Sequence, residues 1–221
     1  MEIEGVAIDI DGTITDRKRS LNCNAVQALR KLRVPVVLAT GNMSCFARTA
    51  AKLIGVSDIV ICENGGVVRF EYDGEDTVLG DKEKCYRALE VLKARYDVEL
   101  LDDDFRKSEI CLRRTFPRDD AARLIEGMGV RLLDSGFAYH IVDESVSKGN
   151  ALRYVADRMG VDVKGFVAIG DSHNDVDMLE VAGVGVAVAN ADVALKRVAD
   201  IVTSRPNGDG VVEALEFLGL I

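Results

Sequence analysis

The chain has 221 residues, enough for one substantial domain or for one domain with a smaller insert. Apolar residues make up 48% and charged residues 29% of it, which places it among ordinary globular proteins. The formal net charge of −9 argues against a general nucleic-acid binder, because affinity for a phosphate backbone comes from clustered Lys and Arg. A small phosphorylated substrate is not excluded, since it needs only one local cationic group.

Residues 6–15 are the most informative stretch of the sequence. The apolar run Val6–Ile10 predicts a buried strand, yet Asp9 and Asp11 lie at its end and point to the same side. Gly12 and Thr13 then turn the chain. Two carboxylates in one crevice are costly unless a cation lies between them. We therefore predict that Asp9 is a nucleophile and Asp11 an acid/base, with Mg²⁺ beside them.

Helices and strands alternate after this stretch. The spacing of apolar residues predicts helices over 24–33 and 43–54 and buried strands over 34–39 and 58–62. A hairpin is expected over 67–79, around Asp-Gly. Alternation of this kind is typical of a parallel α/β sheet.

The pattern changes after residue 80. The predicted elements there are a helix, two strands, a helix and two strands, over 81–95, 98–102, 108–113, 118–127, 130–134 and 138–142. The order αββαββ predicts an antiparallel sheet with helices on one face. We therefore predict an inserted α+β domain over 81–145.

The first pattern returns after the insert. The expected elements are a helix over 148–159 capped by Ser147, followed by three strands and three helices, over 165–169, 175–182, 184–188, 191–198, 200–203 and 208–218. Residues 1–80 and 146–221 are therefore expected to form one α/β core.

Polar residues collect where the predicted strands of the core end. Ligands of open α/β sheets bind at the carboxyl ends of strands. The clusters at such ends or at a helix start are Asp9 with Asp11, Thr40-Gly41-Asn42, Lys148, and Asp171 with Asn174 and Asp175. Carboxylates accompanied by few His and no paired Cys select a hard cation such as Mg²⁺. With a hydroxyl and a lysine, they form a phosphate site that carries its own nucleophile.

The segments Asp9–Thr13, Thr40–Asn42, Lys148-Gly149 and Gly170–Asp175 resemble the four ordered motifs of the haloacid dehalogenase superfamily of phosphotransferases. The match is D-x-D-G-T, then a threonine after a strand, a lysine, and G-D-s-x-N-D. The resemblance implies a Rossmann-like parallel-sheet core, with the insert as a cap domain.

Two further features narrow the resemblance. A cap between the threonine and lysine motifs, with Asn64–Gly66 after the third strand, resembles the Cof-like subgroup of small-molecule phosphatases. The compact insert, the short chain and Ser147–Leu152 are similar to the archaeal-type phosphoglycolate phosphatases. The implied activity is Mg²⁺-dependent hydrolysis of 2-phosphoglycolate to glycolate and phosphate.

The resemblance and the chemistry together imply roles for the acidic residues. Asp9 would attack phosphorus and form an aspartyl phosphate. Asp11 would protonate the leaving alkoxide and then deprotonate the attacking water. The ligands of Mg²⁺ would be the Asp9 side chain, the Asp11 backbone carbonyl and Asp171, with Asp175 ligating the ion or holding one of its waters.

The same resemblance implies a set of substrate-binding groups. The hydroxyl of Thr40 and the amides of Gly41 and Asn42 would bond the phosphoryl oxygens, and Lys148 would neutralise their charge. Asn174 completes the expected substrate-binding set.

Several residues stay open at this point. His140 faces either the cleft or the packing of the insert, and one of Arg113 and Arg114 is a candidate for facing a substrate carboxylate. The pair Glu63-Asn64 is a candidate for holding the hairpin without contacting substrate. The acidic run Asp102–Asp104 is expected to be a solvated hairpin turn.

Two alternative functions stay open as well. A sugar phosphatase or phosphomutase of the same superfamily would use the same motifs. A phospho-accepting signalling module of receiver type would also combine an acceptor Asp, Mg²⁺, Thr and Lys. The receiver is disfavoured because its acceptor lies on a later strand and it has no inserted second domain.

The cysteines and the hydropathy indicate the cellular compartment in which the protein is expected. The five cysteines are scattered without a C-x-x-C pair, at Cys23, Cys45, Cys62, Cys85 and Cys111. Such cysteines are typical of buried thiols in a reducing compartment, so we expect a cytoplasmic protein. No apolar run is long enough to span a membrane and no secretory signal is evident. The expected partner is a small phosphorylated metabolite, without nucleic acid or membrane, in a monomer or homodimer.

Overall fold

The computed structural model describes residues 2–221, and its larger sheet has the strand order β12-β11-β10-β1-β2-β3-β4-β5. Neighbouring strands from β12 to β3 are parallel, whereas β4 and β5 form the antiparallel hairpin at one edge. The strands are β1 (Gly5–Ile8), β2 (Val36–Ala39), β3 (Val60–Cys62), β4 (Val67–Arg69), β5 (Thr77–Val78), β10 (Phe166–Gly170), β11 (Val184–Ala187) and β12 (Ile201–Val202). We call this sheet the core sheet.

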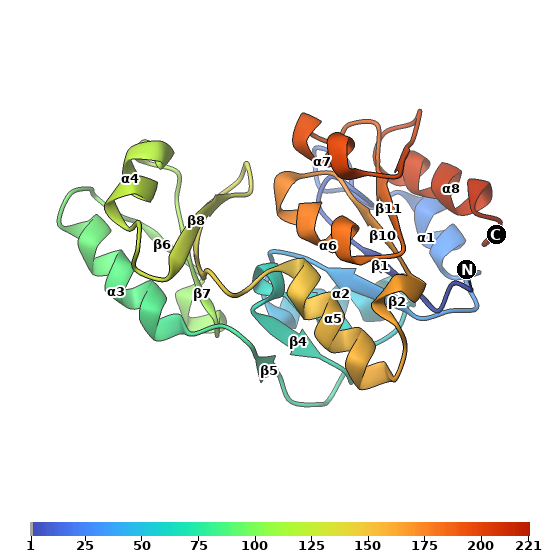
Figure 1. Cartoon of the computed structure of the whole chain (residues 1–221), viewed down its shortest axis with the longest axis horizontal. Helices are drawn as coiled ribbons and strands as arrows, with labels where there is room; N and C mark the ends of the chain where they lie inside the picture. The colour runs from blue at the N-terminus through green and yellow to red at the C-terminus, as the bar shows by residue number, and fades with distance from the viewer. Residues whose placement is uncertain (1) are drawn as a thin grey trace.

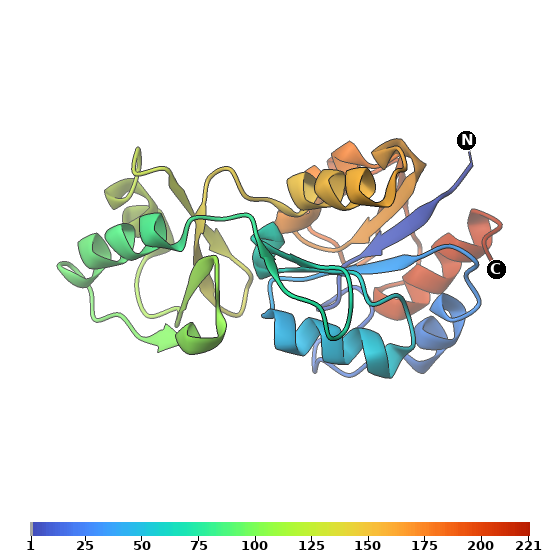
Figure 2. The same ribbon diagram turned by 90° about the horizontal axis from the view of Figure 1, so that it is seen from below.

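Helices cover both faces of the core sheet, as Figures 1 and 2 show. One face packs against α1 (Cys23–Leu29), α2 (Ser44–Ile54) and α8 (Asn207–Phe217). The other packs against α5 (Lys148–Met159), α6 (Val176–Val181) and α7 (Val193–Val198). Side chains of β1 alternate between the two apolar clusters, with Val6 and Ile8 in one and Ala7 in the other. This alternation explains why buried strands of a parallel sheet are apolar throughout.

Residues 82–143, which we call the insert, contain a second sheet with its own apolar cluster (Figure 1). Its antiparallel sheet has the order β6-β7-β9-β8, and two helices pack on it. The elements are α3 (Lys82–Lys93), β6 (Leu100–Leu101), β7 (Glu109–Leu112), α4 (Arg118–Leu124), β8 (Val130–Asp134) and β9 (Tyr139–Asp143). The predicted fold class, a parallel-sheet core with an αββαββ insert, is confirmed.

Short 3₁₀ turns, η1 to η4, occupy Glu63–Gly65, Asp103–Phe105, Val163–Gly165 and His173–Asp175. Two of them, η1 and η4, belong to the site described below. The turn η2 joins the antiparallel strands β6 and β7, and Asp102 and Asp104 are exposed, as predicted for a solvated hairpin turn. Asp103 alone of this run contacts α3: it accepts a hydrogen bond from the hydroxyl of Tyr86 at 2.8 Å and pairs with Lys82 at 3.0 Å.

The helix predicted over 24–33 is shorter in the structure, because α1 ends at Leu29. The strand predicted over 34–39 begins only at Val36. The later start of the strand has a cause in the sequence, because Pro35 has no N–H to donate to a ladder.

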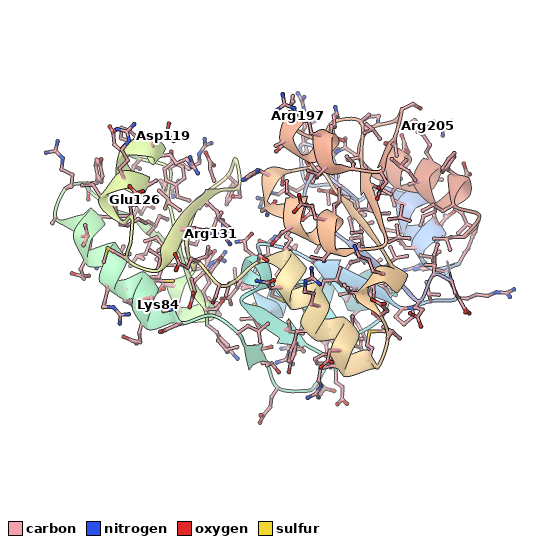
Figure 3. The ribbon with its side chains drawn as sticks, viewed as in Figure 1. Lys84, Asp119, Glu126, Arg131, Arg197 and Arg205 are labelled. Atoms are coloured by element: carbon pink, nitrogen blue, oxygen red, sulfur yellow. The ribbon has the colours of Figure 1, made fainter. Side chains whose placement is uncertain are left out.

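Hydrogen bonds tie together the two chain segments that connect the insert to the core. Asp143 accepts from the backbone N–H of Asp81 at 3.1 Å and from the ammonium of Lys84 at 2.9 Å. The guanidinium of Arg131 donates to the carbonyl of Val146 at 2.5 Å; Figure 3 labels Lys84 and Arg131. These contacts fix the path of both connections relative to the insert. Within residues 2–221, no helix has the length and apolarity needed to cross a membrane.

Candidate active site

Asp9 lies at the carboxyl end of β1, in the middle of the core sheet. Its side chain is buried and accepts two hydrogen bonds, one from a lysine far away in the sequence and one from a threonine in the next turn. Asp9 Oδ1 accepts a hydrogen bond from Lys148 Nζ at 2.7 Å, and Oδ2 accepts one from the hydroxyl of Thr13 at 3.0 Å. The carboxylate is therefore oriented from both sides.

Lys148 is the first residue of α5 and is fully buried. The hydroxyl of Ser147 caps this helix by accepting from the backbone N–H of Asn150. A cation at a helix N-terminus is electrostatically unfavourable. Two carboxylates compensate, because Lys148 Nζ donates to Asp9 and, at 2.6 Å, to Asp175 Oδ1. Burial lowers the pKa of Lys148, but these two carboxylates outweigh it and raise the pKa, so the ammonium stays charged.

Asp171 follows β10, and Asp175 ends the turn η4. Asp175 Oδ2 accepts from the backbone N–H groups of Asp171 and Ser172, both at 3.1 Å. Carboxylate oxygens of Asp9, Asp171 and Asp175 lie within 4.8 Å of one another. Asp9 is far from the other two residues in the sequence, and the fold brings all three to one point.

The electrostatics of this cluster test whether it fits a metal ion. Burial raises the pKa of Asp9 well above its usual range, and the charges of Asp175 and Asp171 raise it further, although Lys148 opposes them. Burial and the charge of Asp175 also raise the pKa of Asp171 to about 7. Three carboxylates face one ammonium, so negative charge is in excess. An all-oxygen donor set with this excess fits a hard divalent cation such as Mg²⁺.

Thr40, Gly41 and Asn42 follow β2, next to β1. The hydroxyl of Thr40 accepts from the backbone N–H of Asn42 at 3.1 Å, and Asn42 Nδ2 donates to Asp11 Oδ2 at 2.7 Å. Asp11 is also 3.6 Å from the guanidinium of Arg19. This turn and Asp11 are therefore linked directly.

A cavity of about 200 Å³ opens between the core and the insert. Six of the predicted site residues line it: Asp9, Asp11, Thr40, Gly41, Asn42 and Asn174. The other three predicted residues do not line the cavity but lie next to Asp9. Lys148 donates to Asp9 and Asp175, and carboxylate oxygens of Asp171 and Asp175 lie within 4.8 Å of Asp9. The nine predicted residues thus form one contiguous group.

Glycine at position 12 is a requirement of the geometry. Gly12 has φ +89°, and a Cβ there would lie 2.2 Å from Asp171 Oδ2. Asn207 Nδ2 holds this turn by donating to the carbonyls of Gly12 at 2.6 Å and Thr15 at 2.9 Å. Asn207 belongs to the residues that sequence reasoning missed, because a single Asn at the start of α8 carries no local signal.

Glu63 and Asn64 hold the insert against the core. The fully buried Glu63 carboxylate accepts from the backbone N–H groups of Lys107 and Ser108 and from the Ser108 hydroxyl at 2.7 Å. Asn64 Nδ2 donates to Glu109 at 2.8 Å, and Asn64 Oδ1 accepts from Asn174 at 3.1 Å. A hydrogen-bonded chain therefore runs from the insert sheet to η4.

The open residues of the insert are now placed. His140 lines the cavity and its Nδ1 lies 2.8 Å from Glu109 Oε1. Arg113 pairs with Glu99 at 2.7 Å, and Arg114 pairs with Asp134 at 2.9 Å. Neither arginine is among the residues that line the cavity. The idea that one of them faces a substrate carboxylate is therefore wrong.

The comparison with protein families decides the relationship. A model described as haloacid dehalogenase-like hydrolase matches residues 6–102 and 116–215. The chain belongs to this family. This family membership sets the receiver-type alternative aside. Close relatives of this chain are named as phosphatases.

Curated relatives cover the whole chain. A phosphoglycolate phosphatase of Archaeoglobus fulgidus is 68% identical over 218 residues, which are 99% of this chain and 98% of that protein. A phosphoglycolate phosphatase of Methanosarcina acetivorans is 47% identical over 220 residues, which are 99% of this chain and 97% of that protein.

Solved structures show the same fold. A crystal structure of a Thermoplasma acidophilum protein superposes with a TM-score of 0.91 at 25% identity and covers 100% of both chains. A haloalkanoate (HAD) superfamily phosphatase of Bacteroides thetaiotaomicron superposes with a TM-score of 0.83 at 21% identity, covering 100% of this chain and 96% of its own.

Proposed function

We propose that this chain is a Mg²⁺-dependent phosphomonoester hydrolase that converts 2-phosphoglycolate to glycolate and phosphate. The buried contact between Lys148 and Asp9, beside the carboxylates of Asp171 and Asp175 that follow the neighbouring strand β10, is the observation that carries this proposal. The two phosphoglycolate phosphatases named above, at 68% and 47% identity over the full chain, support the choice of substrate.

Asp9 is the nucleophile in this proposal. Its buried carboxylate, oriented by Lys148 and Thr13, attacks phosphorus in line with the leaving oxygen and forms an aspartyl phosphate. The Asp9 side chain, the Asp11 backbone carbonyl and Asp171 would hold Mg²⁺, with Asp175 close by. Bound there, the ion would offset the repulsion between the Asp9 carboxylate and the substrate dianion.

Asp11 is the proposed acid/base. Its carboxyl lines the cavity, and Asn42 Nδ2 fixes it at 2.7 Å. It gives a proton to the leaving alkoxide and then takes one from the water that cleaves the aspartyl phosphate. The two transfers leave Asp11 in its starting state after each turnover.

The remaining predicted residues bind the phosphoryl group in this proposal. Thr40 and the N–H groups of Gly41 and Asn42 are its hydrogen-bond donors, and Lys148 balances its charge. Asn42 now donates its backbone N–H to Thr40, so binding substrate exchanges that bond for one to phosphate. Asn174 lines the same cavity and is held by Asn64.

We further propose that residues 1–80 and 146–221 are the catalytic core and that residues 81–145 act as a cap. The insert closes one side of a cavity of about 200 Å³. Pockets for drug-sized ligands usually measure about 300–1,000 Å³. The cavity lies below that range, so the substrate in this proposal is a small phosphate ester.

The test measures phosphate release from 2-phosphoglycolate, sugar phosphates and nucleotides, with Mg²⁺ and then with EDTA. We expect 2-phosphoglycolate to give the largest kcat/KM and EDTA to abolish turnover. Asp9→Asn should abolish turnover of every ester, whereas Asp58→Asn, an exposed control before β3, should not. Undiminished turnover by the Asp9 variant would end the proposal. Transfer of phosphate to an added sugar would identify a phosphomutase instead.

A further inference from the structure

A buried arginine lies on the insert side of the cavity. Arg106 precedes β7, is 6% exposed and lines the same cavity as Asp9 and Asp11. Its Nη1 donates to the carbonyl of Gly41 at 3.0 Å and to Glu109. The guanidinium therefore reaches from the insert to the turn that carries the proposed phosphate-binding donors.

Glu109 holds this guanidinium in place. It is 1% exposed and accepts hydrogen bonds from Asn64 and Arg106, and its Oε1 lies 2.8 Å from His140 Nδ1. Burial acts to raise the pKa of Glu109, but His140 and Arg106 outweigh it, and the pKa is lowered. The carboxylate is thus a charged, immobile anchor with several partners.

The hydrogen-bonding capacity of Arg106 is not used up by this anchor. A guanidinium has five N–H donors. The bonds to Gly41 and Glu109 both come from Nη1, and Nε is buried without a partner among residues 2–221. A buried charged donor without an acceptor is costly. Nε itself has almost no accessible surface, so the donors left for a ligand are those of Nη2, which has no hydrogen-bond partner among residues 2–221 either.

Other arginines are poorer candidates for an anion at this wall. Arg19 also lines the cavity, but its side chain is 48% exposed, pairs with Asp11 and lies over the Phe137 ring at 4.1 Å. Arg113 and Arg114 are satisfied by Glu99 and Asp134. Arg106 alone combines burial, a fixed anchor and an unmatched donor in the described part of this wall.

We propose that Arg106 binds the carboxylate of the substrate and so makes the enzyme selective for short acidic phosphate esters. The inference rests on the proposed function. Arg106 is 3.0 Å from the Gly41 carbonyl, so its guanidinium lies next to the phosphate-binding turn. That closeness fits a carboxylate separated from phosphate by one carbon and one oxygen. Planar guanidinium and carboxylate match as a two-bond pair.

The test compares kcat/KM for 2-phosphoglycolate with kcat/KM for ethyl phosphate, which has the same number of carbons and no carboxylate. The ratio of these two values does not depend on the fraction of folded enzyme. We expect Arg106→Met to lower the ratio by about 100-fold or more, mainly through KM for 2-phosphoglycolate. Arg106→Lys keeps the charge but loses the planar pair, so its ratio should fall between wild type and Arg106→Met.

The matched control is Arg113→Met, which removes an exposed arginine of the insert and should leave the ratio unchanged. An unchanged ratio in both Arg106 variants, with wild type preferring 2-phosphoglycolate, would overturn the assignment of Arg106 alone. A larger fall in Arg19→Met than in Arg106→Met would assign the carboxylate to Arg19. A wild-type enzyme without preference for 2-phosphoglycolate would overturn the substrate proposal and this inference together.

Discussion

The carboxylates around Asp9 make the stability of the metal-free protein depend on pH. Burial, then the charge of Asp175, raises the pKa of Asp171 from 3.8 to about 7. When the pKa of a carboxyl is higher in the folded chain than in the unfolded chain, its contribution to stability is complete below the pKa of the unfolded chain. This contribution is lost as the pH rises through the pKa of the folded chain. The free energy of unfolding should therefore fall between about pH 4 and about pH 7.

The magnitude follows from the same values. A rise of the pKa from 3.8 to about 7, at about 1.4 kcal/mol for each pKa unit, corresponds to about 4 kcal/mol. Asp171→Asn removes the titrating group and keeps an oxygen that can accept from Thr13 or Asn190. Without metal, this variant should be more stable than wild type by about 4 kcal/mol at pH 8 and nearly equal to it at pH 4.

The assay is urea unfolding in EDTA, followed by circular dichroism because the chain has no Trp. Asp143→Asn is the control with the opposite sign. Burial acts to raise the pKa of Asp143, but hydrogen bonds from Lys84, Ser145 and Asp81 lower it to about 2. That variant should be less stable than wild type at pH 8, since a lowered pKa stabilises the fold above the unfolded pKa.

At 100 times its Kd, Mg²⁺ should narrow the difference of about 4 kcal/mol to roughly 1 kcal/mol without reversing it. A ligand at 100 times its Kd stabilises the fold by about 2.7 kcal/mol, and Asp171→Asn loses a proposed ligand of the ion. The reasoning is refuted if Asp171→Asn unfolds at the same urea concentration as wild type, or a lower one, at pH 8 in EDTA. It is also refuted if the pH dependence of wild type is unchanged by the substitution.

Two further predictions test the packing of the site. Lys148→Met leaves buried carboxylates without their cation, so it should lower the free energy of unfolding by about 3–5 kcal/mol and remove phosphate release. Urea unfolding and a phosphate assay check both, and wild-type turnover would contradict the role of Lys148. Gly12→Ala should weaken Mg²⁺ binding in calorimetry, because its Cβ would meet Asp171. Gly127→Ala is the control, since Gly127 has φ +77° with open space around it; equal losses in both would show that backbone strain alone is responsible.

Local signals explain how much of this fold and site could be predicted. Continuous apolar runs predicted the strands of the core sheet, helical spacing predicted the longer helices, and a capping serine marked the start of α5. Asp9, Thr40 and Asp171 directly follow β1, β2 and β10, which are neighbours in the core sheet. The parallel pairing of these strands brings their ends together, so a sequence pattern was sufficient to predict the cluster.

The contacts across the cavity needed the tertiary structure. Which arginine of the insert lines the cavity with Asp9 depends on how the insert lies against the core. Glu63 and Asn64 fix that position through hydrogen bonds to amides and side chains more than 40 residues away in the chain. Neither residue carries a periodic signal, because η1 and the segment before β7 are irregular backbone. Residues of one strand or helix share a repeat that the sequence displays. Two irregular segments from different sheets meet only through packing, and their contact has no pattern along the chain.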